Sequence, residues 1–371
     1  MRWLCAACLA AAIASPASAQ RQRFDVQQFA PPMTQRSSTI GLYQGRTLRR
    51  ENFDVGLVLD WADGPLVLRN DDGDRISEIV SGQLTGHIVG GFGLYDVAEV
   101  LLDIPVILHQ TGDAFGRLPN LDSDASGAGL GIGDLRVGAK VRILQNDDPG
   151  PHAGVALSLA AEVQFPTGER FYYQGGDFRF TPTAAFDVYG KRGHRLTLNV
   201  GYTVRPSATL FDAEVDDTLN YGVAVDFLAT SWMEIIAEIR GKISILADDI
   251  GSAETPLEAA LGIRMRTDFA SVMLSGGVGL IEGFGTPDYR IGLAASYFIS
   301  WEPLRFDYDN DGFYGDGDQC PHQPEDRDGY QDDDGCPDGD PPETPETPRT
   351  ETPRTETPRT ETPRTETPRT E

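Results

Sequence analysis

The sequence predicts an all-β protein: a transmembrane antiparallel up-and-down β-barrel of about 12 strands, followed by a small acidic repeat module and a disordered Pro-rich tail. Three observations predict this fold. Apolar and polar residues alternate with a period of two through the body of the chain, the first residues resemble an export signal, and the composition changes abruptly after Trp301. The chain of 371 residues has a net charge of −26, which excludes a nucleic-acid binder that relies on a basic surface.

Residues 1–19 are predicted to be a signal peptide. A positive residue, Arg2, precedes an apolar run over 4–13, and Ala17-Ser18-Ala19 has the small-x-small pattern that signal peptidase prefers. Residues 20–50 then form a periplasmic N-terminal segment. Because cleavage removes the first two cysteines, only the two near the C-terminus remain, in an exported compartment where a disulfide can persist.

The barrel is predicted over residues 51–302. In 134–143, for example, Leu135, Val137 and Val141 fall on one face and charged residues on the other, which is the pattern of a strand. The same reasoning predicts twelve strands, give or take two, near 53–61, 78–92, 96–109, 133–144, 153–165, 177–189, 194–205, 217–228, 232–245, 257–267, 269–281 and 288–300.

A soluble two-sheet sandwich would show the same alternation, so other features have to separate the two folds. The predicted connections alternate between short turns and longer loops, such as 62–77, and the strands are longer than average. These features and the export signal favour a barrel that crosses the outer membrane of a Gram-negative bacterium. Aromatic residues near many strand ends add support: Trp61, Tyr95, Phe165, Tyr189, Trp232, Phe269, Tyr289 and Trp301.

The inward face of the predicted barrel carries charges of both signs in nearly equal number. The principal candidates are Arg136, Lys140, Arg142, Glu234, Glu238, Arg240 and Lys242. Such charges either pair across the lumen and close it, or form facing acidic and basic strips of a narrow channel. Twelve strands lie between eight-stranded barrels that side chains fill and 16-stranded barrels with open channels, so both alternatives remain.

Residues 307–340 are strongly acidic, with thirteen Asp or Glu and one base. Such a segment cannot bury a core by itself. Hard divalent cations can organise it, because Ca²⁺ takes six to eight oxygen ligands. The spacing Asp307-x-Asp309-x-Asp311-Gly312 also occurs in EF-hand loops, although Asp318 stands where those loops have Glu.

Together with Cys320-Pro321 and the later Asp-Gly and Cys336-Pro337 steps, this region resembles thrombospondin type 3 repeats. The resemblance implies a calcium-binding repeat module over 305–340, with Ca²⁺ as its cofactor and a disulfide between Cys320 and Cys336. The implied metal ligands are Asp307, Asp309, Asp311, Asp316, Asp318, Asp326, Asp328, Asp332 and Asp334. Gly315 departs from the usual repeat, since Asp316 comes one place late.

Residues 341–371 repeat Glu-Thr-Pro-Arg-Thr and are predicted to be an extended linker or tail. The order of signal peptide, barrel, type 3 repeats and Pro-rich linker resembles the OmpA-like outer-membrane family, without that family's C-terminal peptidoglycan-binding domain. We expect outer-membrane lipid around the barrel, and peptidoglycan or periplasmic proteins as partners of the tail. In the last predicted strand, Arg290-x-Gly292-x-x-Ala295-x-Tyr297 resembles the C-terminal signal that the barrel-assembly machinery reads. An even number of strands with the long loops outside would put both termini, and so the calcium module and the tail, in the periplasm.

No catalytic or cofactor-binding motif is recognisable, so we expect a protein that is not an enzyme. Three functions remain. The first is a structural envelope protein whose barrel anchors a calcium-binding periplasmic stalk. The second is a narrow porin-type diffusion channel for small solutes, and the third is calcium-dependent cell adhesion through the type 3 repeats.

Overall fold

The computed structural model describes Val26 and residues 28–70, 74–112, 130–145, 154–168, 177–190, 194–210, 213–230, 232–245 and 250–300, together with 313, 319–320, 323, 325–326, 331–332 and 334–337. The predicted signal peptide, 1–19, and the predicted tail, 341–371, lie outside the described residues. Most of the predicted calcium-binding module, 305–340, lies outside them as well.

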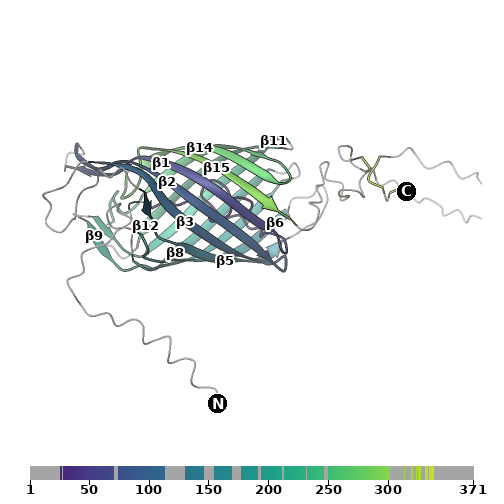
Figure 1. Ribbon diagram of the computed structural model, residues 1–371, viewed down its shortest axis with the longest axis horizontal. Helices are drawn as coiled ribbons and strands as arrows, with labels where there is room; N and C mark the ends of the chain where they lie inside the picture. The colour runs from purple at the N-terminus through teal and green to yellow at the C-terminus, as the bar shows by residue number, and fades with distance from the viewer. Residues whose placement is uncertain are drawn as a thin grey trace, which may run out of the picture.

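Twelve long strands of the described chain close into one antiparallel barrel (Figure 1). They are β1 (Phe53–Arg69), β2 (Arg75–Leu94), β3 (Ala98–Thr111), β5 (Arg136–Gln145), β6 (Gly154–Gln164), β7 (Arg179–Tyr189), β8 (Arg195–Thr203), β11 (Thr218–Thr230), β12 (Met233–Ser244), β13 (Leu257–Arg266), β14 (Ala270–Ile281) and β15 (Tyr289–Ile299). Each pairs with the next along the barrel, and β15 pairs with β1, so the ladder has no open edge. The predicted up-and-down barrel is confirmed.

Three short strands stand apart from this ladder of twelve. β4 (Gly131–Ile132) adds to β3, while β9 (Ala208–Leu210) and β10 (Ala213–Val215) pair with each other. The two ends of the barrel differ. Short turns follow β2, β7, β11 and β13 at the end where β1 begins and β15 finishes, which we call the turn end; the opposite end is the loop end, at the left of Figure 1 with β9.

The hairpin of β1 and β2 is longer than the sequence predicts. The expected loop over 62–77 is wrong, because β1 continues to Arg69 and β2 starts at Arg75. The pairing survives a register shift that brings Leu66 opposite Val80, and both of these side chains are buried. Their apolar contact stabilises strand structure in a segment whose Asp, Gly and Pro content is typical of loops.

The outward face of the barrel is apolar, as a lipid-facing surface requires. Val200 and Ile239 are examples of side chains that alternate with buried polar ones and point away from the lumen. Tyr95, Trp232 and Phe269 are exposed at three of the short turns. Aromatic residues in this position are typical of the interface between a membrane and water.

The described residues contain no helix with the length and apolar character needed to cross a membrane.

Candidate functional site

Residues 28–50 form a segment inside the barrel, which we call the plug. The sequence predicted this region as part of a periplasmic segment over 20–50, and the structure places its described part in the lumen instead. The plug contacts inward side chains of strands on all sides of the barrel: Asp54, Glu99, Lys140, Asp187, Asn199, Glu238 and Arg264. A segment that touches every side of a closed barrel must lie within it.

Buried carboxylates of the barrel wall accept hydrogen bonds from backbone amides of the plug. The donors and acceptors are Gln35 N to Asp54 Oδ2 at 2.6 Å, Leu48 N to Glu99 Oε2 at 2.7 Å, Gly45 N to Asp187 Oδ2 at 2.9 Å, and Gly41 N to Glu238 Oε2 at 3.0 Å. Charged acceptors form stronger hydrogen bonds than neutral ones. Because buried backbone amides require partners, these carboxylates fix where the plug lies.

Buried cations of the wall also hold the plug in place by donating hydrogen bonds to its carbonyl oxygens. Lys140 Nζ also pairs with Glu99 Oε1 at 2.6 Å, and neither side chain is exposed. Lys140 donates to Ser37 O at 3.2 Å, and Arg136 donates to Pro31 O at 2.5 Å. Arg264 donates to Ser38 O at 2.9 Å and to Thr39 O at 3.0 Å. Wall charges of both signs therefore match the polarity of the plug backbone.

Small wall residues make room for the plug's apolar side chains. A Cβ added to Gly138 would lie 2.6 Å from Met33 Cε, and one added to Gly222 would lie even closer to Leu42 Cδ2. Met33 itself is fully buried. Glycine at these inward positions leaves space for the plug's side chains, which would have to shift if a Cβ were present.

The turn-end half of the lumen is filled. Its inward acids expose 2% of their surface or less: Asp54 1%, Glu99 0%, Asp187 0%, Asp226 1% and Glu234 2%. Side chains this inaccessible leave little space for water around the plug. The described plug and wall side chains therefore pack closely at this end of the lumen.

Several of the wall's ion pairs run between neighbouring strands, while Arg290 on β15 reaches Glu258 on β13, beyond β14, at 3.2 Å. Asp103 faces Arg136 across β3 and β5, with their side chains 2.6 Å apart, and Glu258 faces Arg240 across β12 and β13 at 3.0 Å. Arg195 pairs in the same way with Asp226 on β11 at 3.1 Å. The predicted choice between ion pairs across the lumen and two charged strips is thus replaced by a third arrangement, in which ion pairs line the wall and a polar plug fills the centre.

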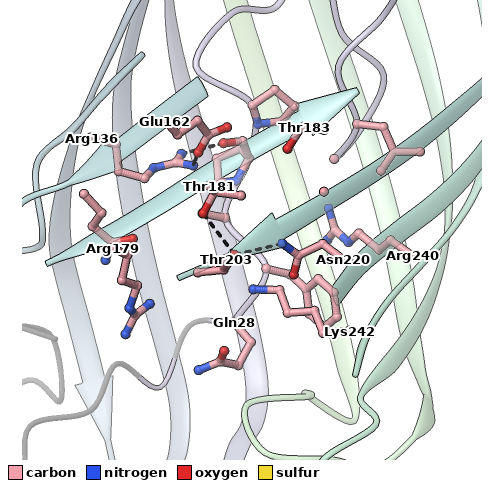
Figure 2. A pocket seen from close by; sticks show the side chains of 18 of the residues that line it. Gln28, Arg136, Glu162, Arg179, Thr181, Thr183, Thr203, Asn220, Arg240 and Lys242 are labelled. Atoms are coloured by element: carbon pink, nitrogen blue, oxygen red, sulfur yellow. Dashed lines mark hydrogen bonds and ion pairs between the residues drawn. The ribbon is translucent and has the colours of Figure 1, made fainter. Parts of the chain in front are cut away.

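A cavity of about 180 Å³ remains toward the loop end, beside the plug (Figure 2). Phe29, Pro31 and Tyr43 of the plug form part of its lining, and the wall contributes side chains from several strands. Among the described residues that line it, the charged ones are the cations Arg136, Arg179, Arg205, Arg240 and Lys242 and the acids Asp103, Asp134 and Glu162. The lining therefore carries more positive than negative charge.

The structure brings most of the predicted lumen residues to the inside of the barrel. Those that are buried are Arg136, Lys140, Glu234, Glu238 and Arg240. Lys242 is partly buried, lines the cavity and has its Nζ 5.4 Å from the ring centre of Phe29. Arg142 is also partly buried and donates to Gln145 Oε1 at 2.6 Å, away from the cavity lining.

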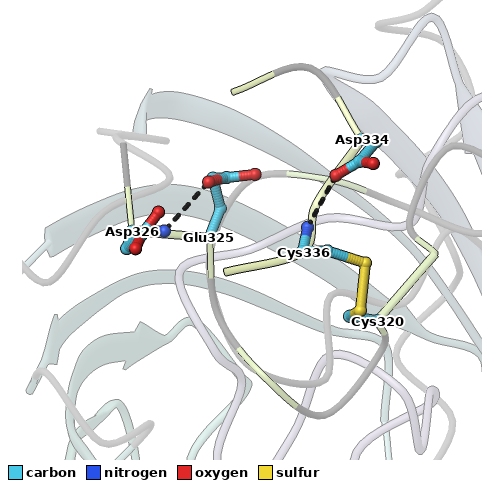
Figure 3. Close-up of a disulfide and its surroundings, with 5 residues drawn as sticks. All are labelled: Cys320, Glu325, Asp326, Asp334 and Cys336. Atoms are coloured by element: carbon cyan, nitrogen blue, oxygen red, sulfur yellow. Dashed lines mark hydrogen bonds between the residues drawn. A yellow bond between two sulfur atoms is a disulfide. The ribbon is translucent and has the colours of Figure 1, made fainter. Parts of the chain in front are cut away.

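The predicted metal ligands are only partly described. Asp326, Asp332 and Asp334 are described, whereas Asp307, Asp309, Asp311, Asp316, Asp318 and Asp328 lie outside the described residues. Cys320 and Cys336 form a disulfide, and Asp334 Oδ1 accepts a hydrogen bond from Cys336 N at 3.1 Å (Figure 3). Within the described part of the chain, no three His, Cys, Asp or Glu residues gather as a metal site. Calcium binding stays a prediction.

The plug is the functional element that sequence reasoning missed. One signal pointed to it: between Gln28 and Gly45 the only charged residue is Arg36, in a chain that is 24% charged. A low-charge segment beside a barrel with many inward charges is compatible with burial in the lumen. The segment lacks the period-two alternation of the strands, so its place inside the barrel could not be recognised from that pattern.

The residue range 70–230 matches the family model described as "Putative MetA-pathway of phenol degradation", a stretch of less than half of the chain. Comparison with curated proteins finds no match.

Comparison with solved structures finds an outer membrane channel, a porin and a hydrocarbon channel. An outer membrane channel from Pseudomonas putida F1 is 12% identical, with a TM-score of 0.52 over 68% of this chain and 97% of that one. The NanC porin is 8% identical, with a TM-score of 0.43 over 66% and 99% of the two chains. The TodX monoaromatic hydrocarbon channel is 10% identical, with a TM-score of 0.35 over 69% and 91%. The first likeness shows that the chain has a barrel fold of the outer-membrane type.

Proposed function

We propose that this protein is a narrow outer-membrane diffusion channel for small solutes that its own plug closes. One observation carries the proposal: a segment without a large apolar core of its own occupies the lumen through hydrogen bonds to wall carboxylates and cations. Polar contacts of this kind can be exchanged for contacts with water at modest net cost. Opening then requires the plug to give up these polar contacts and the burial of apolar side chains such as Met33, while the barrel stays folded.

The similarity to known proteins supports a channel over a purely structural anchor. The solved structure with a TM-score above 0.5 is described as an outer membrane channel. The family description names phenol degradation, a pathway whose substrates are small aromatic compounds. Transport of small organic solutes is consistent with both.

Single-channel recording in a planar bilayer tests the proposal. The full-length protein is refolded, and heat-modifiable gel mobility confirms that the barrel has formed. We expect brief, discrete openings in the wild type and longer ones in Asp54→Asn/Glu238→Gln, because each substitution weakens the acceptor of plug amides. Asp74→Asn, on the exposed connection between β1 and β2, is the matched control and should behave as the wild type. Silence from both the wild type and the double variant, once folded, would contradict a channel.

We also propose that the segment 305–340 binds Ca²⁺ as a separate module, anchored by the barrel and continued by the tail over 341–371. The disulfide between Cys320 and Cys336 and the hydrogen bond at Asp334 support a compact loop. Calorimetric titration of the full chain with Ca²⁺ tests this second function. We expect Ca²⁺ binding that is weakened in Asp332→Asn/Asp334→Asn and unchanged in Asp74→Asn. The absence of any heat of binding would refute the calcium module.

A further inference from the structure

The cavity at the loop end has two chemically different sides. Its lining includes apolar plug residues, among them Phe29, Pro31 and Leu42, and a wall of charged side chains and hydroxyl groups in which cations outnumber acids. A cavity of about 150 Å³ is large enough to hold one benzene ring. The observed volume of about 180 Å³ is therefore compatible with a single ring that carries a small polar group.

Two arginines face each other at the loop-end side of the cavity. The bridge between Phe180 and Val204 continues the pairing of β7 and β8, so the next residues in register are Arg179 and Arg205. Their side chains point inward, and the residues expose only 7% and 8% of their surface. Both side chains already interact with other groups of the protein. An anion bound between the two guanidinium groups would accept further charge-assisted hydrogen bonds from both.

Hydroxyl and amide groups lie next to the arginine pair (Figure 2). Thr181 Oγ1 and Thr203 Oγ1 are 2.9 Å apart, and Asn220 Nδ2 donates to Thr203 Oγ1 at 2.8 Å. All three residues line the cavity. This chain of polar groups fixes the side chains beside the arginines, so that a ligand's oxygen atoms would meet a preorganised surface.

The other cations of the cavity lie against an aromatic ring. Arg240 Cζ is 5.2 Å and Lys242 Nζ is 5.4 Å from the ring centre of Phe29. Both distances are within the range of a cation–π interaction. Since these positions already accommodate the ring of Phe29, the cavity is suited to aromatic groups next to positive charge.

We propose that the loop-end cavity binds a single-ring aromatic carboxylate, with its carboxylate between Arg179 and Arg205 and its ring on the side of Phe29. The inference deepens the proposed function, because it names the class of solute that the channel would admit. Binding to the cavity and conduction through the barrel are separate measurements, so the failure of one is distinguishable from the failure of the other.

Isothermal titration calorimetry of the refolded full-length protein with sodium benzoate tests the proposal. Benzyl alcohol, which has the ring without the charge, and sodium acetate, which has the charge without the ring, are the matched ligands. We expect benzoate to bind most tightly of the three. Arg179→Gln/Arg205→Gln should weaken benzoate binding about tenfold or more, because it removes two charge-assisted hydrogen bonds.

Arg142→Gln is the matched control variant, because Arg142 also faces the interior of the barrel but does not line the cavity. It should leave benzoate binding unchanged. Lys242→Gln is the second test variant and should weaken benzoate binding less than the double variant does. Heat-modifiable mobility is checked for each protein, and if the arginine variant does not fold, Lys242→Gln alone decides the test.

Three outcomes would overturn the site. They are no binding of benzoate to the folded wild type, equal binding of acetate, and benzoate affinity that neither Arg179→Gln/Arg205→Gln nor Lys242→Gln changes. Benzoate binding to a barrel that never conducts would leave the site intact and refute the channel. Conduction without benzoate binding would refute the site and leave the channel intact.

Discussion

The two halves of the lumen use the same barrel wall for different purposes. At the turn end, inward acids are almost completely buried and accept hydrogen bonds from the plug backbone. At the loop end, the plug lines only part of a cavity of about 180 Å³, and cations outnumber acids among its described lining residues. The first half closes the barrel, whereas the second half presents a surface that can select a solute.

The near balance of inward charge therefore conceals an uneven distribution of acids and cations along the barrel axis. Acids such as Asp54 and Glu99 lie near the start of their strands at the turn end, where plug amides need acceptors. Arg179 and Arg205 lie at the loop end, where solutes from outside would arrive if the short turns face the periplasm. A total count of charges therefore predicts neither closure nor selectivity.

Removing the plug should produce the largest effect. Replacing residues 30–45 by a short Gly-Ser linker is expected to raise single-channel conductance severalfold, because a 12-stranded barrel without its filling has space for ions. The measurement is planar-bilayer recording. Deletion of the tail over 341–371 is the control and should leave conductance unchanged. Equal conductance with and without the plug, in a folded barrel, would show that the plug does not close the lumen.

Breaking the buried ion pair at the turn end should have the next largest effect. Lys140→Met leaves the carboxylate of Glu99 buried without its cation, which typically costs about 3–5 kcal/mol of the free energy of unfolding. Urea unfolding in detergent, followed by gel mobility, measures the loss. The double variant Glu99→Gln/Lys140→Met should recover part of it, since no unpaired charge remains. If the double variant is no more stable than the single one, the pair does not hold this end together.

The strands were predictable because each has one lipid-facing and one inward face, and this requirement imposes a period of two on the sequence. β12, for example, was expected over 232–245 and occupies Met233–Ser244. The extension of β1 and β2 was not predictable, since it depends on contacts such as that between Leu66 and Val80 after a register shift.

The plug could not be derived from local pattern. Its contacts join residues far apart in the chain, as between Thr39 and Glu238, or Gly45 and Asp187. The inward direction of Glu238 was predictable from alternation, but its partner was not. Every residue except proline has a backbone amide that can donate, so the sequence does not mark which residue donates to Glu238. The arginine pair was likewise predictable as two inward charges but not as a facing pair.

A substitution that shortens a buried side chain of the plug should have a smaller effect on the closed state of the lumen. Met33→Ala removes a fully buried side chain and should cost about 2–5 kcal/mol, which we expect to favour unseating of the plug. More frequent openings in single-channel records would show this. Met265→Ala, on the exposed outward face of β13, is the matched control. Unchanged opening frequency in Met33→Ala would mean that polar contacts alone seat the plug.

The smallest expected effect concerns ion selectivity at the loop end. Arg205→Gln removes one positive charge from the cavity lining and should shift the reversal potential in a KCl gradient toward that of a more cation-selective channel. Arg142→Gln, outside the lining, should shift it less. An equal shift in both variants would mean that the cavity has no special part in selection.

A reversible disulfide between the plug and the barrel wall tests whether the lumen opens by movement of the plug. A Cβ at position 91 on β2 would lie 3.6 Å from Cβ of Thr34, within the roughly 3.5–4.5 Å of a disulfide. Single-channel recording of Thr34→Cys/Gly91→Cys, with Cys320→Ser/Cys336→Ser to remove the native disulfide, should show no openings when oxidised and renewed openings after reduction. Equal conductance in the oxidised and reduced states would contradict the account.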